Sequence, residues 1–154
     1  MADASIFDRL KQDHDAHRQL FDKMADAKGQ PDRLEKLFEQ FKVEVTAHAA
    51  AEEETLYSTM LARPDLREDA QHSVSEHKEI DDYLEEMAGL SFNGEEWNGV
   101  FVQLKKRYLH HIDEEEKEMF PNAARELTAE EEQKLAALFA MRKPAELQRA
   151  EADE

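Results

Sequence analysis

The chain of 154 residues is long enough for one domain with a substantial core, and its net charge of −17 argues against nucleic-acid or anionic-membrane partners, whose own negative charge would repel it. Zero cysteines exclude a disulfide framework and a thiolate metal site, so a bound metal would need nitrogen and oxygen ligands. The sequence shows neither a signal peptide nor an apolar run of membrane-spanning length, and we therefore expect a cytoplasmic protein.

Glycine and proline, four residues of each, fall mainly in a few well-separated breaks. The breaks lie at 28–31, 62–65, 89–94 and 121–122, and the segments between them carry apolar residues at helical spacing. Scarce helix breakers and 37% charged residues favour an all-helical (all-α) protein with solvated outer faces. Four long helices joined by short connections predict an up-down-up-down four-helix bundle.

The first two predicted helices carry polar residues in phase with their apolar faces. In the helix before the first break, His14 and His17 continue the apolar face, one turn apart. In the next helix, the apolar face ends in His48 and Glu52. Buried polar groups of this kind are costly unless they are paired or bound to a metal.

The third and fourth predicted helices repeat this pattern. His77 lies in phase with the apolar residues of the third helix, and His111 with Glu115 lies in phase with those of the fourth. His110 is a rival to His111 because His110 and Glu114 share the same spacing, but it is out of phase with its helix. His72 is also out of phase, and we interpret both His72 and His110 as surface residues.

A short fifth helix is predicted near the carboxyl end. Thr128 and Glu131 form a capping-box pattern, and apolar residues follow at helical spacing. We expect this helix to complete a single domain over residues 1–143. Beyond it, the charged segment 144–154, which begins at Pro144, is expected to be a disordered tail.

The two His-x-x-x-Glu motifs are the strongest functional signal. Positions four apart lie on one face of a helix, so His48 with Glu52, and His111 with Glu115, each present an imidazole and a carboxylate to one point. Counting residues from the turns, at about 1.5 Å each, places further inward histidines near the same layer of the bundle. The six candidate metal ligands in this layer are His14, His48, Glu52, His77, His111 and Glu115.

Four imidazoles and two carboxylates exceed the needs of one metal ion, since a tetrahedral zinc site takes at most four protein ligands. They suit two octahedral ions bridged by the carboxylates. The ligand types favour a dinuclear iron centre, and manganese or a mixed-metal pair would satisfy the same geometry.

The motifs that carry these residues resemble those of the hemerythrin-like, HHE cation-binding domains. The paired motifs are H-A-A-A-E-E-E-T-L-Y at 48–57 and H-I-D-E-E-E-K-E-M-F-P at 111–121, while K-Q-D-H at 11–14 and S-E-H-K-E-I at 75–80 resemble the family's motifs on the first and third helices. The resemblance covers about residues 5–125. It implies a four-helix bundle holding a non-haem di-iron site, oxo- or hydroxo-bridged, with the six candidate residues as ligands.

One departure from the family pattern shapes the expected function. Oxygen-carrying hemerythrins place a second histidine one turn before the third-helix histidine, and here that position is Ser73. His17 is a candidate for the missing nitrogen ligand. The smaller ligand set favours a centre that binds or reacts with oxygen, peroxide or nitric oxide over a simple oxygen carrier. Alternatives are peroxidase, catalase-like or oxidase activity at the same site, or a module for iron sensing, delivery or iron-centre repair.

Overall fold

Each long helix begins at residues suited to a helix N-terminus. In the computed structural model, which describes residues 5–153, the Ser5 side chain accepts a hydrogen bond from the backbone N–H of Asp8 at 3.2 Å. Pro31 and Pro64 occupy the first positions of two other helices, where a backbone N–H has no helical partner. The four long helices are α1 (Ile6–Asp26), α2 (Pro31–Glu52), α4 (Pro64–Ala88) and α5 (Glu95–Glu114).

Both helices that carry a His-x-x-x-Glu motif continue beyond it through a widened, π-helical turn. The segments η1 (Glu53–Tyr57) and α3 (Ser58–Leu61) extend α2, while η2 (Glu115–Met119) and α6 (Phe120–Glu126) extend α5. Such turns insert a residue into an otherwise regular helix and are frequent at functional sites. The insertion changes which later residues face the bundle interior.

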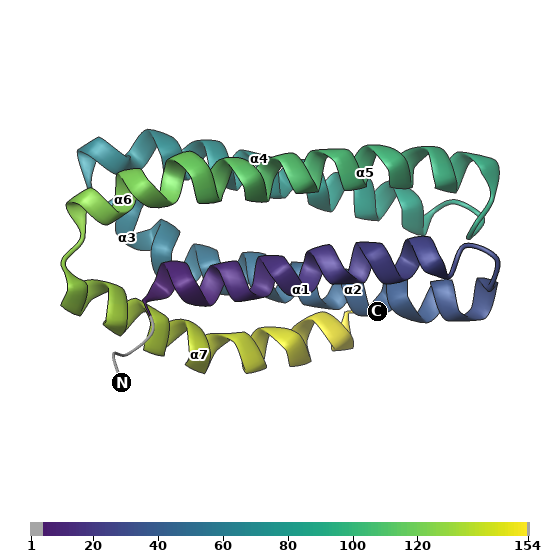
Figure 1. Cartoon of the computed structure of the whole chain (residues 1–154), viewed down its shortest axis with the longest axis horizontal. Helices are drawn as coiled ribbons and strands as arrows, with labels where there is room; N and C mark the ends of the chain where they lie inside the picture. Colours follow the sequence, from purple (N-terminus) through teal and green to yellow (C-terminus); the bar gives the residue numbers. More distant parts are fainter. Residues whose placement is uncertain (1–4, 154) are drawn as a thin grey trace.

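Counted together with these extensions, the four long helices are the four rods of the bundle, and they form two antiparallel pairs (Figure 1). α1 lies beside α2 and α4 beside α5, and the pairs meet where α1 packs on α5 and α2 on α4. Between residues 5 and 153 the structure contains helices and turns but no strand. The predicted all-helical, up-down-up-down bundle is therefore confirmed.

The fifth helix, α7 (Ala129–Ala152), packs along α2 and α1 on the outside of the bundle (Figure 1). It begins as the sequence predicts. The Thr128 side chain accepts a hydrogen bond from the backbone N–H of Glu131, and the Glu131 side chain accepts one from the backbone N–H of Thr128. The helix has 24 residues, much longer than the short helix that we expected.

The expected tail needs correction, because α7 passes through Pro144 and the segment 144–152 is helical. A proline inside a helix removes one backbone hydrogen bond and crowds the preceding turn. Tertiary contacts offset this cost, since Lys143 on one side of the proline and Glu146 and Ala150 on the other are buried against the bundle. The helix is thus held by packing, which the composition of the segment does not indicate.

Two apolar clusters fill the bundle on either side of a layer of buried polar residues. On α1, one cluster contains Ile6, Phe7 and Leu10 and the other contains Leu20, Phe21 and Met24, with His14 and His17 between them. The large side chains of the first cluster include Phe7, Leu56, Tyr57, Phe120 and Phe139, and those of the second include Phe21, Phe38, Phe41, Trp97 and Tyr108. The polar layer is therefore shielded from water at both ends.

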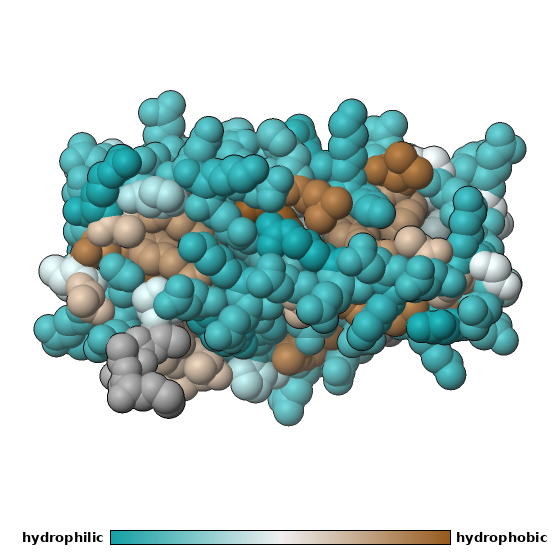
Figure 2. All heavy atoms as spheres, in the orientation of Figure 1, coloured by the Kyte–Doolittle hydropathy of each residue, from teal (hydrophilic) through white to brown (hydrophobic). Residues whose placement is uncertain are grey.

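The outer surface is predominantly hydrophilic on the face shown in Figure 2, with apolar atoms visible in patches between polar side chains. This agrees with the sequence, in which 37% of residues are charged. Among the described helices none is both long and apolar enough to cross a membrane.

Candidate metal centre

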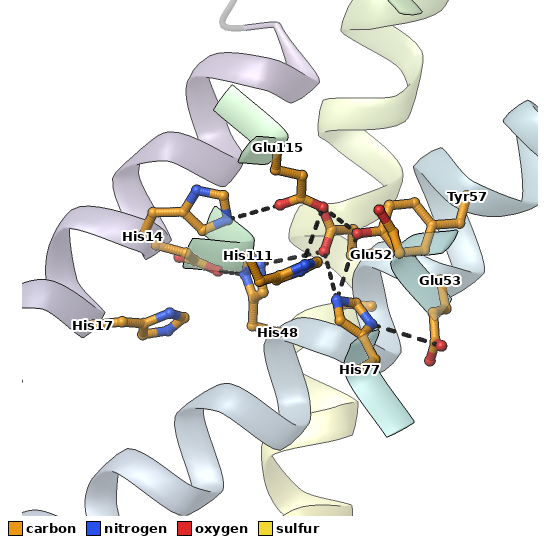
Figure 3. A network of polar contacts seen from close by, with 12 residues as sticks. His14, His17, His48, Glu52, Glu53, Tyr57, His77, His111 and Glu115 are labelled. Atoms are coloured by element: carbon orange, nitrogen blue, oxygen red, sulfur yellow. Dashed lines mark hydrogen bonds and ion pairs between the residues drawn. The ribbon is translucent and has the colours of Figure 1, made fainter. Parts of the chain in front are cut away.

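The six candidate ligands converge in the polar layer from all four rods of the bundle (Figure 3), and none of their residues is more than 7% exposed. Their potential ligand atoms form two groups, within each of which the atoms lie within 4.8 Å of one another. One group is Glu52, His77, His111 and Glu115, and the other is His14, His48 and Glu52. Glu52 belongs to both groups, so the arrangement has the form of two neighbouring sites.

Both carboxylates lie between histidines of different helices. Oε1 of Glu52 is 3.5 Å from Nε2 of His48 and 3.4 Å from Nε2 of His77. Oε1 of Glu115 is 3.1 Å from Nε2 of His14, and Oε2 of Glu115 is 3.8 Å from Nε2 of His111. Each carboxylate thus lies close to a histidine on its own helix or its extension and to a second histidine across the bundle.

The opposite ring nitrogen, Nδ1, of each of these four histidines faces outward to a carboxylate. The pairs are His14 with Glu116 at 2.7 Å, His48 with Asp13 at 2.8 Å, His111 with Glu76 at 2.8 Å and His77 with Glu53 at 3.6 Å. A carboxylate on one ring nitrogen orients the ring and makes the other nitrogen a better metal ligand. Three of these contacts are hydrogen bonds, the His77 contact is longer than a hydrogen bond, and all four Nε2 atoms point into the layer (Figure 3).

The outer carboxylates follow an internal pseudo-symmetry of the sequence. The acidic residues that precede the single histidines, Asp13 and Glu76, hold the histidines of the His-x-x-x-Glu motifs. The acidic residues that follow the motifs, Glu53 and Glu116, contact the single histidines in return. Sequence reasoning missed these four residues, although the dipeptides D-H at 13–14 and E-H at 76–77 were a visible signal.

Several of the inward atoms are buried without a hydrogen-bond partner in the part of the chain that the structure describes. They are Nε2 of His14 and His48, both carboxylate oxygens of Glu52 and Oε1 of Glu115. Buried polar atoms are normally satisfied, and leaving several together without partners is costly. Imidazole nitrogens and carboxylate oxygens are the donors that iron, manganese and zinc accept, so the residues present fit a metal centre.

The electrostatics of the layer also favour a cation. Burial alone would lower the pKa of His14, but its contacts with Glu115 and Glu116 outweigh burial and raise that pKa to about 9. Burial likewise opposes protonation of His77, whose pKa rises to about 10 because of Glu52 and Glu53. Burial would raise the pKa of Glu52, yet the neighbouring histidines hold it well below its usual value. In the metal-free chain, protonated His14 and His77 therefore supply the positive charge that a bound metal ion would bring.

Comparison with known proteins places the chain in a family. A model of the hemerythrin HHE cation-binding domain matches residues 5–123. The chain belongs to the hemerythrin HHE cation-binding domain family. The resemblance to HHE domains that the sequence motifs indicated is confirmed. The match includes all six candidate ligands.

A solved HHE domain shares the fold. The crystal structure of the Mycobacterium kansasii homolog of Rv2633c, an HHE cation-binding domain-containing protein, superposes with a TM-score of 0.83 at 20% identity, covering 95% of this chain and 89% of that one. A DNA nickase of Nostoc sp. (strain PCC 7120) is 28% identical over 142 residues. That alignment covers 89% of this chain but only 38% of the nickase, so the chain spans well under half the length of that relative.

His17 lies beside the HHE centre but outside both groups of close ligand atoms (Figure 3). Its ring is fully buried, with its centroid 5.2 Å from that of His48. The Tyr108 hydroxyl hydrogen-bonds to Nδ1 of His17 at 2.6 Å, while Nε2 has no hydrogen-bond partner among the described residues. Burial, with the nearby His48, lowers the pKa of His17 well below its usual value, so the ring is a neutral imidazole.

Tyr57 reaches the centre although its position relative to the motif did not suggest it. Its buried hydroxyl donates to Oε2 of Glu115 and lies 3.4 Å from Nε2 of His77 (Figure 3). In a regular α-helix a residue five positions after Glu52 would be rotated about 140° away from it. The π-helical turn η1 removes most of that rotation, because its hydrogen bonds span five residues. The Ser73 side chain, at the position of the expected fifth histidine, contacts this hydroxyl.

α7 contributes to the centre from outside the segment that matches the family model. Nζ of Lys143 lies 2.8 Å from Oδ2 of Asp13, the same oxygen that accepts from Nδ1 of His48. Burial would raise the pKa of Asp13, but His48 and Lys143 together hold it well below its usual range. Asp13 therefore remains an anion, and the fifth helix supports the orientation of one candidate ligand.

Proposed function

We propose that this HHE domain holds two iron ions, oxo- or hydroxo-bridged, between the four histidines and the two carboxylates. The observation that carries the proposal is the set of buried Nε2 and carboxylate oxygen atoms that face one another without hydrogen-bond partners in the described chain. The sharing of Glu52 between two groups supports two ions over one. Manganese or a mixed-metal pair would use the same donors.

Such a pair of ions supplies electrons and an open coordination position for a small ligand, namely oxygen, peroxide or nitric oxide. The chain contributes the surroundings. The two apolar clusters keep water from the layer, and the outward carboxylates hold the histidines in their orientation. The Tyr57 hydroxyl holds a proton beside Glu115. Because burial, with Glu115 and Glu52 nearby, raises the Tyr57 pKa, the hydroxyl carries its proton at neutral pH.

Metal analysis tests the proposal directly. Iron-loaded protein should contain about two irons per chain and show a charge-transfer band near the ultraviolet edge. A double variant, His48→Ala with His111→Ala, should lose both the iron and the band. His110→Ala is the matched control, because that histidine neighbours His111 in sequence but is exposed. A double variant that keeps its iron and its colour would refute the proposed ligand set.

We propose His17 as an additional nitrogen ligand. Its ring is neutral, and its Nε2 atom is buried and without a hydrogen-bond partner in residues 5–153, so this nitrogen is available to a metal ion. In iron-loaded protein, His17→Ala should shift the charge-transfer band while keeping the iron content. A crystal structure of the loaded protein in which Nε2 of His17 lies beyond bonding distance of either metal would remove this ligand.

A second candidate function is turnover of peroxide at the same centre. The specific observation that favours it is Tyr57, whose hydroxyl offers a proton at Glu115 inside an apolar environment. Peroxide consumption should fall by about 100-fold in Tyr57→Phe, within the usual range for removal of a positioned acid. Binding without turnover in the wild type would favour the sensing or delivery alternatives. DNA nicking is not proposed, because a net charge of −17 would repel phosphate.

A further inference from the structure

Two further His-x-x-x-Glu pairs lie outside the buried centre. His72 and Glu76 stand one turn apart on α4, and His110 and Glu114 stand one turn apart on α5. Nε2 of His72 is 3.2 Å from Oε1 of Glu114 and 3.5 Å from Oε1 of Glu76. These atoms of His72, Glu76 and Glu114 all lie within 4.8 Å of one another. We call these three residues the outer triad.

The outer triad has the composition of a cation site that exchanges its ion with solvent. One imidazole and two carboxylates are a common ligand set for divalent transition metals that keep a position open for water. The His72 side chain is 57% exposed and that of Glu114 is 31% exposed, so a bound ion would retain part of its hydration. Asp69 and Glu118 line the same depression and add negative charge.

A cavity of about 60 Å³ joins the outer triad to the buried centre. Its lining contains the three triad residues together with His111 and Glu115, two candidate ligands of the buried centre. Glu115 is 2% exposed and His111 is 2% exposed, so the inner end of the cavity reaches two side chains of the buried layer. The cavity is large enough for a few water molecules, or for a cation that keeps part of its hydration.

Glu76 links the two sites chemically. Its Oε1 atom accepts a hydrogen bond from Nδ1 of His111 at 2.8 Å and also faces Nε2 of His72. A cation on the outer triad would therefore share a carboxylate with the residue that orients His111. Negative charge at the outer end of the cavity and an imidazole with a carboxylate at its inner end provide a path that attracts a cation.

We propose that His72, Glu76 and Glu114 form a second, exchangeable divalent-cation site, and that ferrous iron reaches the buried centre through it. The outer site follows from the distances among His72, Glu76 and Glu114, while its role in metal entry rests on the proposed function. Two experiments separate these parts.

The first experiment measures cation binding at the outer triad. Mn²⁺ is titrated into iron-loaded protein, because it is the weakest binder of the first-row series and will not displace the buried iron. Loss of the free Mn²⁺ electron paramagnetic resonance signal should reveal one additional ion per chain. His72→Ala and Glu114→Gln should weaken this binding at least tenfold. Asp82→Asn is the matched control, because it removes one negative charge from an exposed position on the same helix.

Absence of the additional Mn²⁺, or equal binding in His72→Ala and wild type, would overturn the outer site. Circular dichroism checks folding of the variants, which change exposed or half-exposed side chains.

The second experiment measures entry by stopped-flow mixing of metal-free protein with Fe²⁺. His72→Ala and Glu114→Gln should slow uptake at least tenfold and reach the same final iron content, whereas Asp82→Asn should load at the wild-type rate. Unchanged uptake rates would overturn the entry role and leave the Mn²⁺ result standing. If wild type takes up no iron at all, the proposed function fails, and the difference in Mn²⁺ binding between wild type and the His72→Ala and Glu114→Gln variants still decides the outer site.

Discussion

At the scale of single residues, the centre depends on carboxylates that do not face the metal. Asp13, Glu76 and Glu116 each accept a hydrogen bond from Nδ1 of a candidate histidine ligand at 2.7 to 2.8 Å. They set the tautomer and the direction of the ring, so that Nε2 points inward. Their energetic importance follows from burial, because a weakly screened hydrogen bond to an anion is stronger than one in water.

Asp13→Asn should lower the affinity of the centre for metal by about 10- to 100-fold, the usual effect of losing such a partner. The asparagine keeps an acceptor oxygen near His48 but loses the charge that strengthens the ring as a ligand. Affinity would be measured by competition with a coloured chelator. Asp15→Asn, at an exposed position on the same helix, is the control and should bind metal like wild type. Equal affinity of Asp13→Asn and wild type would contradict the role assigned to Asp13.

The raised histidine pKa values predict how the metal-free protein responds to pH. His14 and His77 have pKa values of about 9 and about 10 in the folded chain, against 6.5 in an unfolded one. Because the folded state binds these protons more tightly, their stabilisation is complete below pH 6.5 and is lost as pH rises to between 9 and 10. The free energy of unfolding should therefore fall across this interval by about 1.4 kcal/mol per pH unit for each of the two histidines that is still losing its proton.

Urea unfolding of metal-free protein at several pH values would measure this loss. Iron-loaded protein is the comparison, because metal ligation replaces the protons. A metal-free protein whose stability stays constant from pH 6.5 to pH 10 would contradict the protonated histidines.

At the scale of elements, two departures from regular helices shape the site. The π-helical turn η1 brings Tyr57 to Glu115, and the related turn η2 begins at Glu115 itself. α7 runs through Pro144, directly after Lys143, whose side chain reaches Asp13. In both places a locally unfavourable backbone persists because tertiary contacts near the buried layer hold it.

Pro144→Ala should raise the free energy of unfolding by about 1 to 3 kcal/mol, because alanine restores the missing backbone hydrogen bond within α7. Pro144 is exposed, so the substitution removes no buried contact. Chemical denaturation would measure the change, with Ala145→Gly as a control that should destabilise the same exposed stretch by about 1 kcal/mol. Destabilisation by Pro144→Ala would show that α7 does not continue through this position.

At the scale of the whole molecule, the bundle consists of two apolar clusters separated by a polar layer. The clusters provide the hydrophobic stabilisation, whereas the unpartnered atoms of the layer oppose folding until a cation joins them. The metal-free fold is therefore less stable than it would be with an apolar centre, and the site already has its shape before a metal ion binds. Metal binding should return that stability, since the ligands converge in this way only in the folded chain.

Removing the metal should accordingly lower the stability of the whole domain. At a free metal concentration 100 to 1,000 times the dissociation constant, the difference would be about 3 to 4 kcal/mol. Thermal or chemical unfolding with and without a chelator would measure it. In the His48→Ala, His111→Ala double variant the chelator should have no effect. If wild type and this variant respond to the chelator alike, the centre does not couple metal binding to folding.

By itself, the sequence determined the four long helices of the bundle, their inward faces and six polar residues that share a layer. It could do so because a helix repeats every 3.6 residues and the turns are marked by glycine and proline. His48, Glu52, His111 and Glu115 were predictable from spacing alone, and their convergence with His14 and His77 followed from counting residues between turns.

Only the tertiary structure decided which residues support those six. Tyr57 depends on a π-helical turn, Lys143 on the packing of α7 against α1 and α2, and the outer triad on the approach of α4 to α5. Each of these requires contacts between segments far apart in the chain, for which local periodicity carries no signal. The physical reason is that periodicity reports the direction of a side chain within one helix, whereas partners are set by how helices pack.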